Sequence, residues 1–213
     1  MDKYDAYLYD MDGTLARTLD VWIDACQAAY VYYGIQVSRD ETATRLGTVP
    51  GMLAGIAVEN HEEAWKRITE YSHPRVKTAP LYDGAVAGIN RARADQKKTA
   101  LITATSRDIV TEILAYHNLL SHFDVIITGD EVKANKPDPE GILRAIAALS
   151  IEPSKAIMLG DSDKDLGAAQ NAGIDSALYY PEAHSLIHDL THLKTFNPTY
   201  TIAHWDDFLP RSI

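Results

Sequence analysis

Five short apolar segments recur along the chain, and longer amphipathic segments separate them. Each apolar segment is too short to be a surface helix, so each predicts a buried β-strand. Strands that alternate with helices imply right-handed crossovers and a parallel sheet with both faces covered. The sequence therefore predicts an α/β core. The predicted strands are Tyr4–Tyr9, Thr99–Thr103, Val125–Thr128, Ala156–Gly160 and Ser176–Tyr180.

Helices are predicted in the intervals between these strands. One of them carries a clear start signal, because Asp138 can act as the N-cap and Pro139 suits the first helical position. The predicted helices are Asp83–Asp95, Arg107–His117, Pro139–Leu149 and Lys164–Asn171.

Between the first strand and the rest of the α/β pattern, strand signals vanish and the pattern becomes helical. Apolar residues from Leu19 to Tyr33 keep helical spacing, and Gly34 is a natural helix end. Ser38 and Asn60 each begin a segment typical of a capping box. We expect a four-helix insertion here. The predicted division assigns residues 1–15 and 79–213 to the core and residues 16–78 to the insertion.

The charge balance argues against a nucleic-acid partner. The chain has 20 basic and 30 acidic residues, a formal net charge of −10, whereas polyanion binding normally needs a basic excess. No stretch approaches the roughly 18 apolar residues of a membrane span, and the N-terminus lacks the apolar run of a secretory signal. The single cysteine, Cys26, fits a reducing compartment. We expect a cytoplasmic monomer or weak dimer with no membrane partner.

Two carboxylates follow the first predicted strand, in the segment Asp10-Met11-Asp12-Gly13-Thr14. Ligands of open α/β sheets bind outside the carboxyl ends of the strands. Two acids crowded at such a place repel each other unless they share a cation, so the pair implies a metal. Calcium loops and ordinary acidic turns contain the same pattern, so the pair alone does not decide.

Polar residues also follow three other predicted strands. Thr103 and Ala104 precede a helix whose backbone N–H groups could hold a phosphate, and Lys136 lies in a stiff turn before a helix. Asp161 and Asp165 follow the fourth strand. A helix cap, a solvated lysine and an acidic loop are the ordinary explanations of these features one by one. Their occurrence together, in this order, favours a site for phosphate and metal.

In this order and context the chain resembles the haloacid dehalogenase superfamily, in its phosphatase branch. The resemblance rests on Asp10-Met11-Asp12-Gly13-Thr14, Thr103, Lys136-Pro137 and Gly160-Asp161-Ser162-Asp163-Lys164-Asp165, and it extends from about Tyr4 to Tyr180. The insertion resembles the small cap of the phosphoglycolate phosphatase and β-phosphoglucomutase-like subfamily. The resemblance implies a Rossmann-like parallel-sheet core with an inserted four-helix cap domain.

The resemblance also implies a phosphoaspartyl mechanism. Asp10 would be the nucleophile, and Asp12 would be the general acid and then the base. Mg²⁺ would be held by the side chains of Asp10 and Asp161 and the main-chain carbonyl of Asp12, while Asp165 would orient a metal-bound water. The transferring phosphoryl oxygens would be bound by Thr103, the N–H groups around Ala104, and Lys136.

The expected function is Mg²⁺-dependent hydrolysis of a small phosphorylated metabolite. A phosphomutase and a non-catalytic phosphate-sensing protein are the alternatives, and the complete set of motif residues argues against the second. A dehalogenase is disfavoured because that branch usually lacks the second aspartate, which is Asp12 here. The chain departs from common relatives at Arg17 and Thr18, where an acidic residue and a serine are frequent.

Two further features have no settled role in the sequence. Arg45 lies in a predicted loop between cap helices and could bind the part of the substrate that does not react, or it could be solvated. His184, His188 and His192 recur every four residues, so on one helix they would share a face and could bind a metal. No carboxylate or cysteine partner for them is evident in the sequence.

Overall fold

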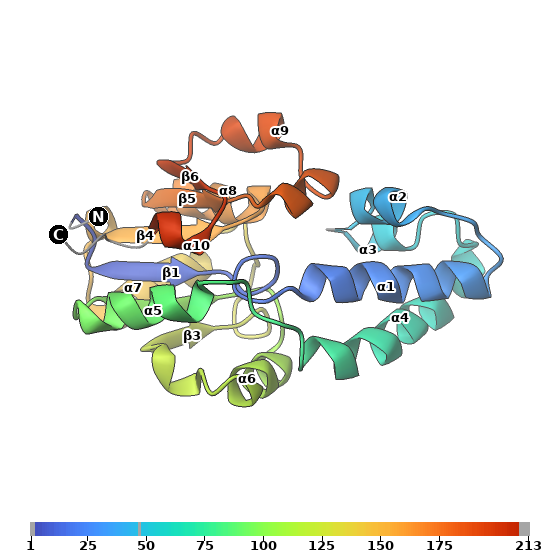
Figure 1. Cartoon of the computed structure of the whole chain (residues 1–213), viewed down its shortest axis with the longest axis horizontal. Coiled ribbons are helices and arrows are strands. Elements are labelled where there is room, and N and C mark those ends of the chain that lie inside the picture. The colour runs from blue at the N-terminus through green and yellow to red at the C-terminus, as the bar shows by residue number, and fades with distance from the viewer. Residues whose placement is uncertain (1–2, 47, 209–213) are drawn as a thin grey trace.

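The computed structural model describes residues 3–46 and 48–208. Within these residues, six strands form one sheet in the order β3-β2-β1-β4-β5-β6, and all neighbouring strands are parallel. Helices flank the sheet (Figure 1), so the predicted α/β class is confirmed. The strands are β1 (Ala6–Tyr9), β2 (Lys98–Ile102), β3 (Val125–Ile127), β4 (Ala156–Gly160), β5 (Asp175–Tyr179) and β6 (Tyr200–Ile202).

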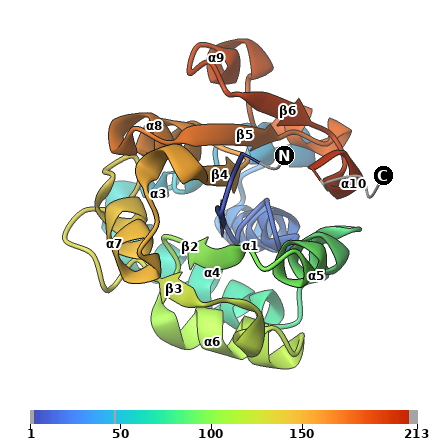
Figure 2. The same ribbon diagram turned by 90° about the vertical axis from the view of Figure 1, so that its left-hand side faces the viewer.

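Strand β1 lies inside the sheet and is buried on both faces. Its side chains alternate, because Tyr7 and Tyr9 belong to one hydrophobic cluster and Ala6 and Leu8 to the other. The first cluster includes α5 (Ala85–Ala94) and α6 (Arg107–Tyr116), and the second includes α7 (Glu140–Leu149) and α8 (Asp163–Ala172). Figure 2 shows α5 and α7 on opposite sides of the sheet.

The sequence predicts five of the six strands to within two residues of their observed bounds. The sequence does not predict β6, because β6 is a three-residue edge strand in which only Ile202 is buried. The start of α7 also differs from the prediction. Pro139 is the N-cap residue, and Asp138 Oδ1 accepts a hydrogen bond of 2.9 Å from the Glu140 N–H, the first backbone donor after the proline.

The chain between β1 and α5 forms a helical unit with a hydrophobic core of its own, which includes Cys26 and Ile68. Ser38 caps α2 as predicted, since its Oγ accepts a hydrogen bond from the Glu41 N–H. The predicted capping box at Asn60 is wrong. Asn60 has a helical rather than extended backbone and makes no capping bond. The elements are α1 (Thr18–Tyr32), α2 (Arg39–Thr44), α3 (Val49–Met52), η1 (Val58–Asn60) and α4 (His61–Val76).

Two connections join the helical unit to the sheet, and they pair with each other. The Arg17 N–H donates to the Pro80 carbonyl at 2.8 Å, and the Tyr82 N–H donates to the Leu15 carbonyl at 3.0 Å. Ala16 is fully buried and forms bridges with Asp12 and Leu81. The start of α1 is therefore held close to the loop that follows β1.

Short helices fill the remaining connections and the C-terminal part of the described chain. His184, His188 and His192 do not share one helix, because η4 ends at Leu186 and α9 begins at Leu190. The short helices are η2 (Leu120–His122), η3 (Pro153–Lys155), η4 (Glu182–Leu186), α9 (Leu190–Lys194) and α10 (Trp205–Phe208).

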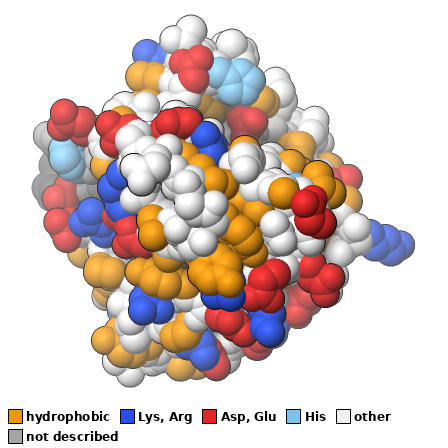
Figure 3. Space-filling view, turned by 90° about the vertical axis from the view of Figure 1, so that its right-hand side faces the viewer, with side chains coloured by type: hydrophobic (Ala, Val, Ile, Leu, Met, Phe, Trp, Pro, Cys, Tyr) orange, Lys and Arg blue, Asp and Glu red, His pale blue; other side chains and the backbone are white. Residues whose placement is uncertain are grey.

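The helical end of the molecule shows hydrophobic side chains near the middle of its face, with acidic and basic side chains interspersed around them (Figure 3). The most exposed large hydrophobic residues of the helical unit are Val31, Tyr32 and Val58. Across residues 3–46 and 48–208, every helix is too short or too polar to cross a membrane.

Trp205 ties α10 to the loop that follows β1. Its ring is 1% exposed, stacks on Tyr9, and donates a hydrogen bond of 3.1 Å from Nε1 to the Thr14 carbonyl. We predict that Trp205→Ala lowers the free energy of unfolding by about 3–5 kcal/mol, measured by urea denaturation. Trp205→Phe should lose less, because it keeps an aromatic ring against Tyr9. A loss below about 1 kcal/mol in the alanine variant would contradict this packing role.

Candidate active site

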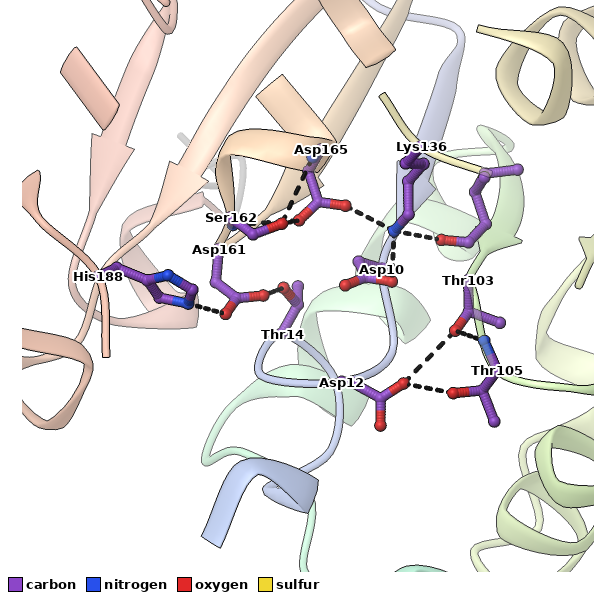
Figure 4. A network of polar contacts seen from close by, with 11 residues as sticks. Asp10, Asp12, Thr14, Thr103, Thr105, Lys136, Asp161, Ser162, Asp165 and His188 are labelled. Atoms are coloured by element: carbon purple, nitrogen blue, oxygen red, sulfur yellow. Dashed lines mark hydrogen bonds and ion pairs between the residues drawn. The ribbon is translucent and has the colours of Figure 1, made fainter. Parts of the chain in front are cut away.

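A cavity of about 380 Å³ opens at the carboxyl ends of β1 and β4. Residues of the segments that follow the strands line one part of it, and Leu19, Leu46 and Thr48 of the helical unit line another. Figure 4 shows the polar side chains that converge here from the loops after β1, β2, β3 and β4. The predicted site residues in its wall are Asp10, Asp12, Ala104, Lys136 and Asp161.

The Lys136 ammonium lies between two buried carboxylates. Its Nζ donates to Asp10 Oδ1 and to Asp165 Oδ1, both at 2.6 Å, and to the Ile102 carbonyl at 3.0 Å. Asp165 is fully buried, and its second oxygen accepts hydrogen bonds from the Ser162 hydroxyl and N–H. A Cβ at Gly160 would overlap the Asp165 side chain, so glycine is required at the end of β4.

Asp161 follows β4 and lies beside the loop that carries Asp10. Its Oδ1 accepts a hydrogen bond of 2.9 Å from the Thr14 hydroxyl. Gly13 has φ +81, and a Cβ there would overlap the Asp161 carboxylate, so a side chain at position 13 is excluded on two grounds. The tight turn after β1 thus brings the Asp10 and Asp161 carboxylates together.

Hydroxyl groups from two elements hold the Asp12 carboxylate. Thr18, at the start of α1, donates to Oδ1 at 2.6 Å, and Thr105 donates to Oδ2 at 2.7 Å. Thr103 lies 3.5 Å from the same oxygen and accepts a hydrogen bond from the Thr105 N–H. The sequence predicts Thr103 as a site residue but does not reveal Thr18 and Thr105 as partners of Asp12. Both are hydroxyl residues close in sequence to predicted site residues, Thr18 to Asp12 and Thr105 to Thr103. This closeness is the signal that could have identified them.

The site holds more negative than positive charge at close range. The carboxylates of Asp10, Asp161 and Asp165 approach within 4.8 Å of one another, and Lys136 is the ammonium paired with two of them. Burial raises the pKa of Asp10 well above its usual range, Asp165 and Asp161 add to the rise, and Lys136 opposes it. Burial also lowers the pKa of Lys136, but Asp10 and Asp165 outweigh that effect and keep the ammonium charged. This donor set of hard oxygens with excess negative charge fits a divalent cation such as Mg²⁺.

Two histidines that the sequence leaves without a partner meet Asp161. His188 Nε2 lies 3.0 Å from Asp161 Oδ2, and His184 Nδ1 lies 3.8 Å from the same oxygen. Burial raises the pKa of Asp161, but the hydrogen bond from His188 and the proximity of His184 outweigh burial and lower it overall. His192 lies apart from this group, with Nε2 3.7 Å from Asp163.

The structure does not bring Arg45 to the cavity. Its guanidinium donates to the Ala54 carbonyl at 3.0 Å and to Glu41 at 2.5 Å, and it stacks over the Tyr30 ring. Arg45 thus contacts its own helical unit, and its contact with a substrate stays a prediction. Leu46 and Thr48 are the members of the same segment that line the cavity.

Comparison with known proteins gives a consistent result. The profile of the haloacid dehalogenase-like hydrolase family matches residues 7–179. Pyrophosphatase PpaX of Bacillus anthracis is 26% identical over 211 residues, which cover 98% of this chain and 96% of PpaX. A structure assigned as a haloacid dehalogenase-like hydrolase of Bacteroides fragilis has a TM-score of 0.83 at 22% identity and covers 97% of this chain and 100% of its own. A structure assigned as a β-phosphoglucomutase of Thermotoga maritima has a TM-score of 0.79 at 24% identity, with 96% of both chains covered.

The raised pKa of Asp10 leads to a prediction about stability without metal. A carboxyl whose pKa is higher in the folded chain lowers stability once both states are ionised, and this penalty disappears below the unfolded pKa. We predict that Asp10→Asn raises the melting temperature in EDTA at neutral pH by a few degrees, at roughly 2–4 °C per kcal/mol. Differential scanning calorimetry tests this, with the exposed Asp95→Asn as the matched control. A lower melting temperature of Asp10→Asn in EDTA would show that pairing with Lys136 dominates instead.

Proposed function

The chain belongs to the haloacid dehalogenase-like hydrolases, and we propose that it is a Mg²⁺-dependent phosphatase that hydrolyses a small phosphomonoester through a phosphoaspartyl intermediate on Asp10. One observation carries this proposal. Asp10 faces the cavity with its carboxylate paired to a buried lysine, and Asp12 stands two residues away in the same cavity wall. A nucleophile and a proton-transfer group are thus available to one ligand.

Asp10 is the nucleophile in this proposal. Its carboxylate attacks phosphorus in line with the leaving oxygen, and the P–O bond to the leaving group breaks as the acyl phosphate forms. The Lys136 ammonium lies 2.6 Å from Asp10 Oδ1, which fixes the direction of the other oxygen and opposes the rise in the pKa of Asp10 that burial causes. The same ammonium lowers the repulsion between the carboxylate and an anionic phosphoryl group.

Asp12 transfers the protons. In the first step it protonates the leaving oxygen, and in the second it removes a proton from the water that attacks the phosphoaspartate. The Thr18 and Thr105 hydroxyls orient its carboxylate from opposite oxygens. Because Thr18 belongs to α1, movement of the helical unit would alter the position of Asp12. We therefore propose that this unit, residues 16–78, acts as a cap.

The remaining residues bind the phosphoryl group and the cation. Thr103, the N–H groups around Ala104, and Lys136 bind phosphoryl oxygens. Mg²⁺ would be held by Asp10, Asp161 and the Asp12 main-chain carbonyl, and it supplies charge neutralisation at the phosphoryl group. Asp165 would orient a metal-bound water, and its buried contact with Lys136 at 2.6 Å supports a further part in placing the lysine.

The proposed substrate class is a small phosphorylated metabolite. A cavity of about 380 Å³ has room for a phosphoryl group with a small leaving group. Leu46 and Thr48 of the cap face the leaving-group side in this proposal, in place of Arg45. PpaX is a pyrophosphatase and the Thermotoga maritima protein is assigned as a β-phosphoglucomutase, so inorganic pyrophosphate and hexose phosphates belong in the first substrate panel.

We predict that Asp10→Asn folds but loses at least about 99% of phosphate release, because an amide is a poor nucleophile. The assay measures free phosphate from sugar phosphates, short-acid phosphates and pyrophosphate, with Asp95→Asn as the control. Retention of more than about a hundredth of the activity would refute the assignment of Asp10 as nucleophile. Interconversion of hexose phosphate isomers faster than phosphate release would identify a mutase instead.

The oxygen donor set predicts the response to metals. Removal of divalent cations with EDTA should abolish phosphate release, and Mg²⁺ should restore it. Ca²⁺ should inhibit, because its larger and looser ligand shell does not hold the in-line geometry. Full activity in EDTA, or equal activity in Ca²⁺ and Mg²⁺, would count against the proposed mechanism.

A further inference from the structure

A second group of possible metal ligands lies around the Oδ2 atom of Asp161. His184 Nδ1, His188 Nε2 and Asp161 Oδ2 lie within 4.8 Å of one another. The two imidazoles come from η4 and the turn after it, so neither belongs to the motifs that the proposed function uses. Nothing in the phosphatase mechanism above requires them.

The environment of His184 indicates that its Nδ1 is available to a ligand. The side chain is 1% exposed, and Nδ1 makes no hydrogen bond of normal geometry to any described residue, although Asp161 and the Tyr179 carbonyl are near it. Nε2 lies 2.8 Å from the Tyr82 hydroxyl. When Nε2 carries the proton and donates it to Tyr82, Nδ1 presents a lone pair toward Asp161 Oδ2 at 3.8 Å. In that tautomer the lone pair faces a buried carboxylate, an arrangement that a cation between the two atoms would stabilise.

The distances suit a transition metal. Zn²⁺ bonds to nitrogen and oxygen at about 2.0–2.1 Å, which places tetrahedral ligand atoms about 3.3 Å apart. The observed separations from Asp161 Oδ2 are 3.0 Å to His188 Nε2 and 3.8 Å to His184 Nδ1. Small movements of two side chains therefore produce the required spacing. Tyr82 would supply the outer hydrogen bond that metal-binding histidines usually make through their second nitrogen.

We propose that Asp161, His184 and His188 form a binding site for a divalent transition metal of the Zn²⁺ class, distinct from the proposed Mg²⁺ site but sharing Asp161 with it. Two imidazoles select such ions over Mg²⁺, which prefers an all-oxygen shell. His188 and Asp161 also line the cavity, so an ion has a path of entry and open positions for water. Because Asp161 serves both sites, occupation by Zn²⁺ would compete with the use of Asp161 by Mg²⁺.

Metal binding to the tag-free protein tests the proposal without any need for turnover, so its failure is distinguishable from failure of the proposed function. Zn²⁺ is titrated calorimetrically in the presence of excess Mg²⁺, and Co²⁺ is used as a spectroscopic probe. The wild-type protein should bind one Zn²⁺ that excess Mg²⁺ does not displace. His188→Ala should weaken this binding more than about 100-fold, and Tyr82→Phe by about 10- to 100-fold, as for loss of an outer hydrogen bond. The exposed His204→Ala should bind like the wild type.

Nitrogen NMR of the unmodified protein provides a second test that does not depend on whether a variant folds. Addition of Zn²⁺ should shift Nδ1 of His184 and Nε2 of His188, and leave the ring nitrogens of His204 unchanged. Zn²⁺ that Mg²⁺ displaces fully, with equal affinity in His188→Ala and no shift of either nitrogen, would overturn the proposal. The two histidines would then serve only to orient Asp161.

Discussion

The buried contact of Lys136 with Asp10 and Asp165 is the interaction on which the site depends. Carboxylates from the ends of β1 and β4 approach within 4.8 Å of one another, and such a group is costly to bury without compensation. The ammonium, 2.6 Å from each of two carboxylates, offsets part of this charge. The negative charge that remains favours the binding of a cation and of an electrophile at the same place. The charge imbalance is therefore both a cost to the fold and the source of the proposed chemistry.

The fold brings these groups together because the strands are parallel. The carboxyl ends of β1, β2 and β4 lie at one edge of the sheet, and two glycines allow the close approach of their loops. The helical unit meets this edge through Thr18, which holds Asp12, and through Leu46 and Thr48, which line the cavity. The two connecting segments pair with each other near Ala16 and Leu81, and this pairing fixes the position of the helical unit relative to the site. In the proposed mechanism, proton transfer and selection of the leaving group would therefore both involve the helical unit.

The sequence predicts the central sheet and the strand-end residues because both are local signals. A short apolar strand followed by polar residues marks Asp10, Thr103 and Asp161 without knowledge of their neighbours. The partners of these residues depend on contacts between distant segments. His188 lies 27 residues from Asp161, and Tyr82 lies 102 residues from His184, so no local pattern reports either pair. The position of the Arg45 guanidinium likewise depends on its contacts with Tyr30, Glu41 and Ala54, which the sequence does not reveal.

The central claim is that Asp10 forms a covalent bond to the phosphoryl group of the substrate. Borohydride reduces an acyl phosphate to an alcohol, so it converts a phosphoaspartate to homoserine, which mass spectrometry locates in the digested chain. Enzyme quenched during turnover with Mg²⁺ should contain homoserine at position 10, and enzyme quenched without substrate should not. Homoserine at position 12, or its absence from both positions while phosphate is released, would contradict the account.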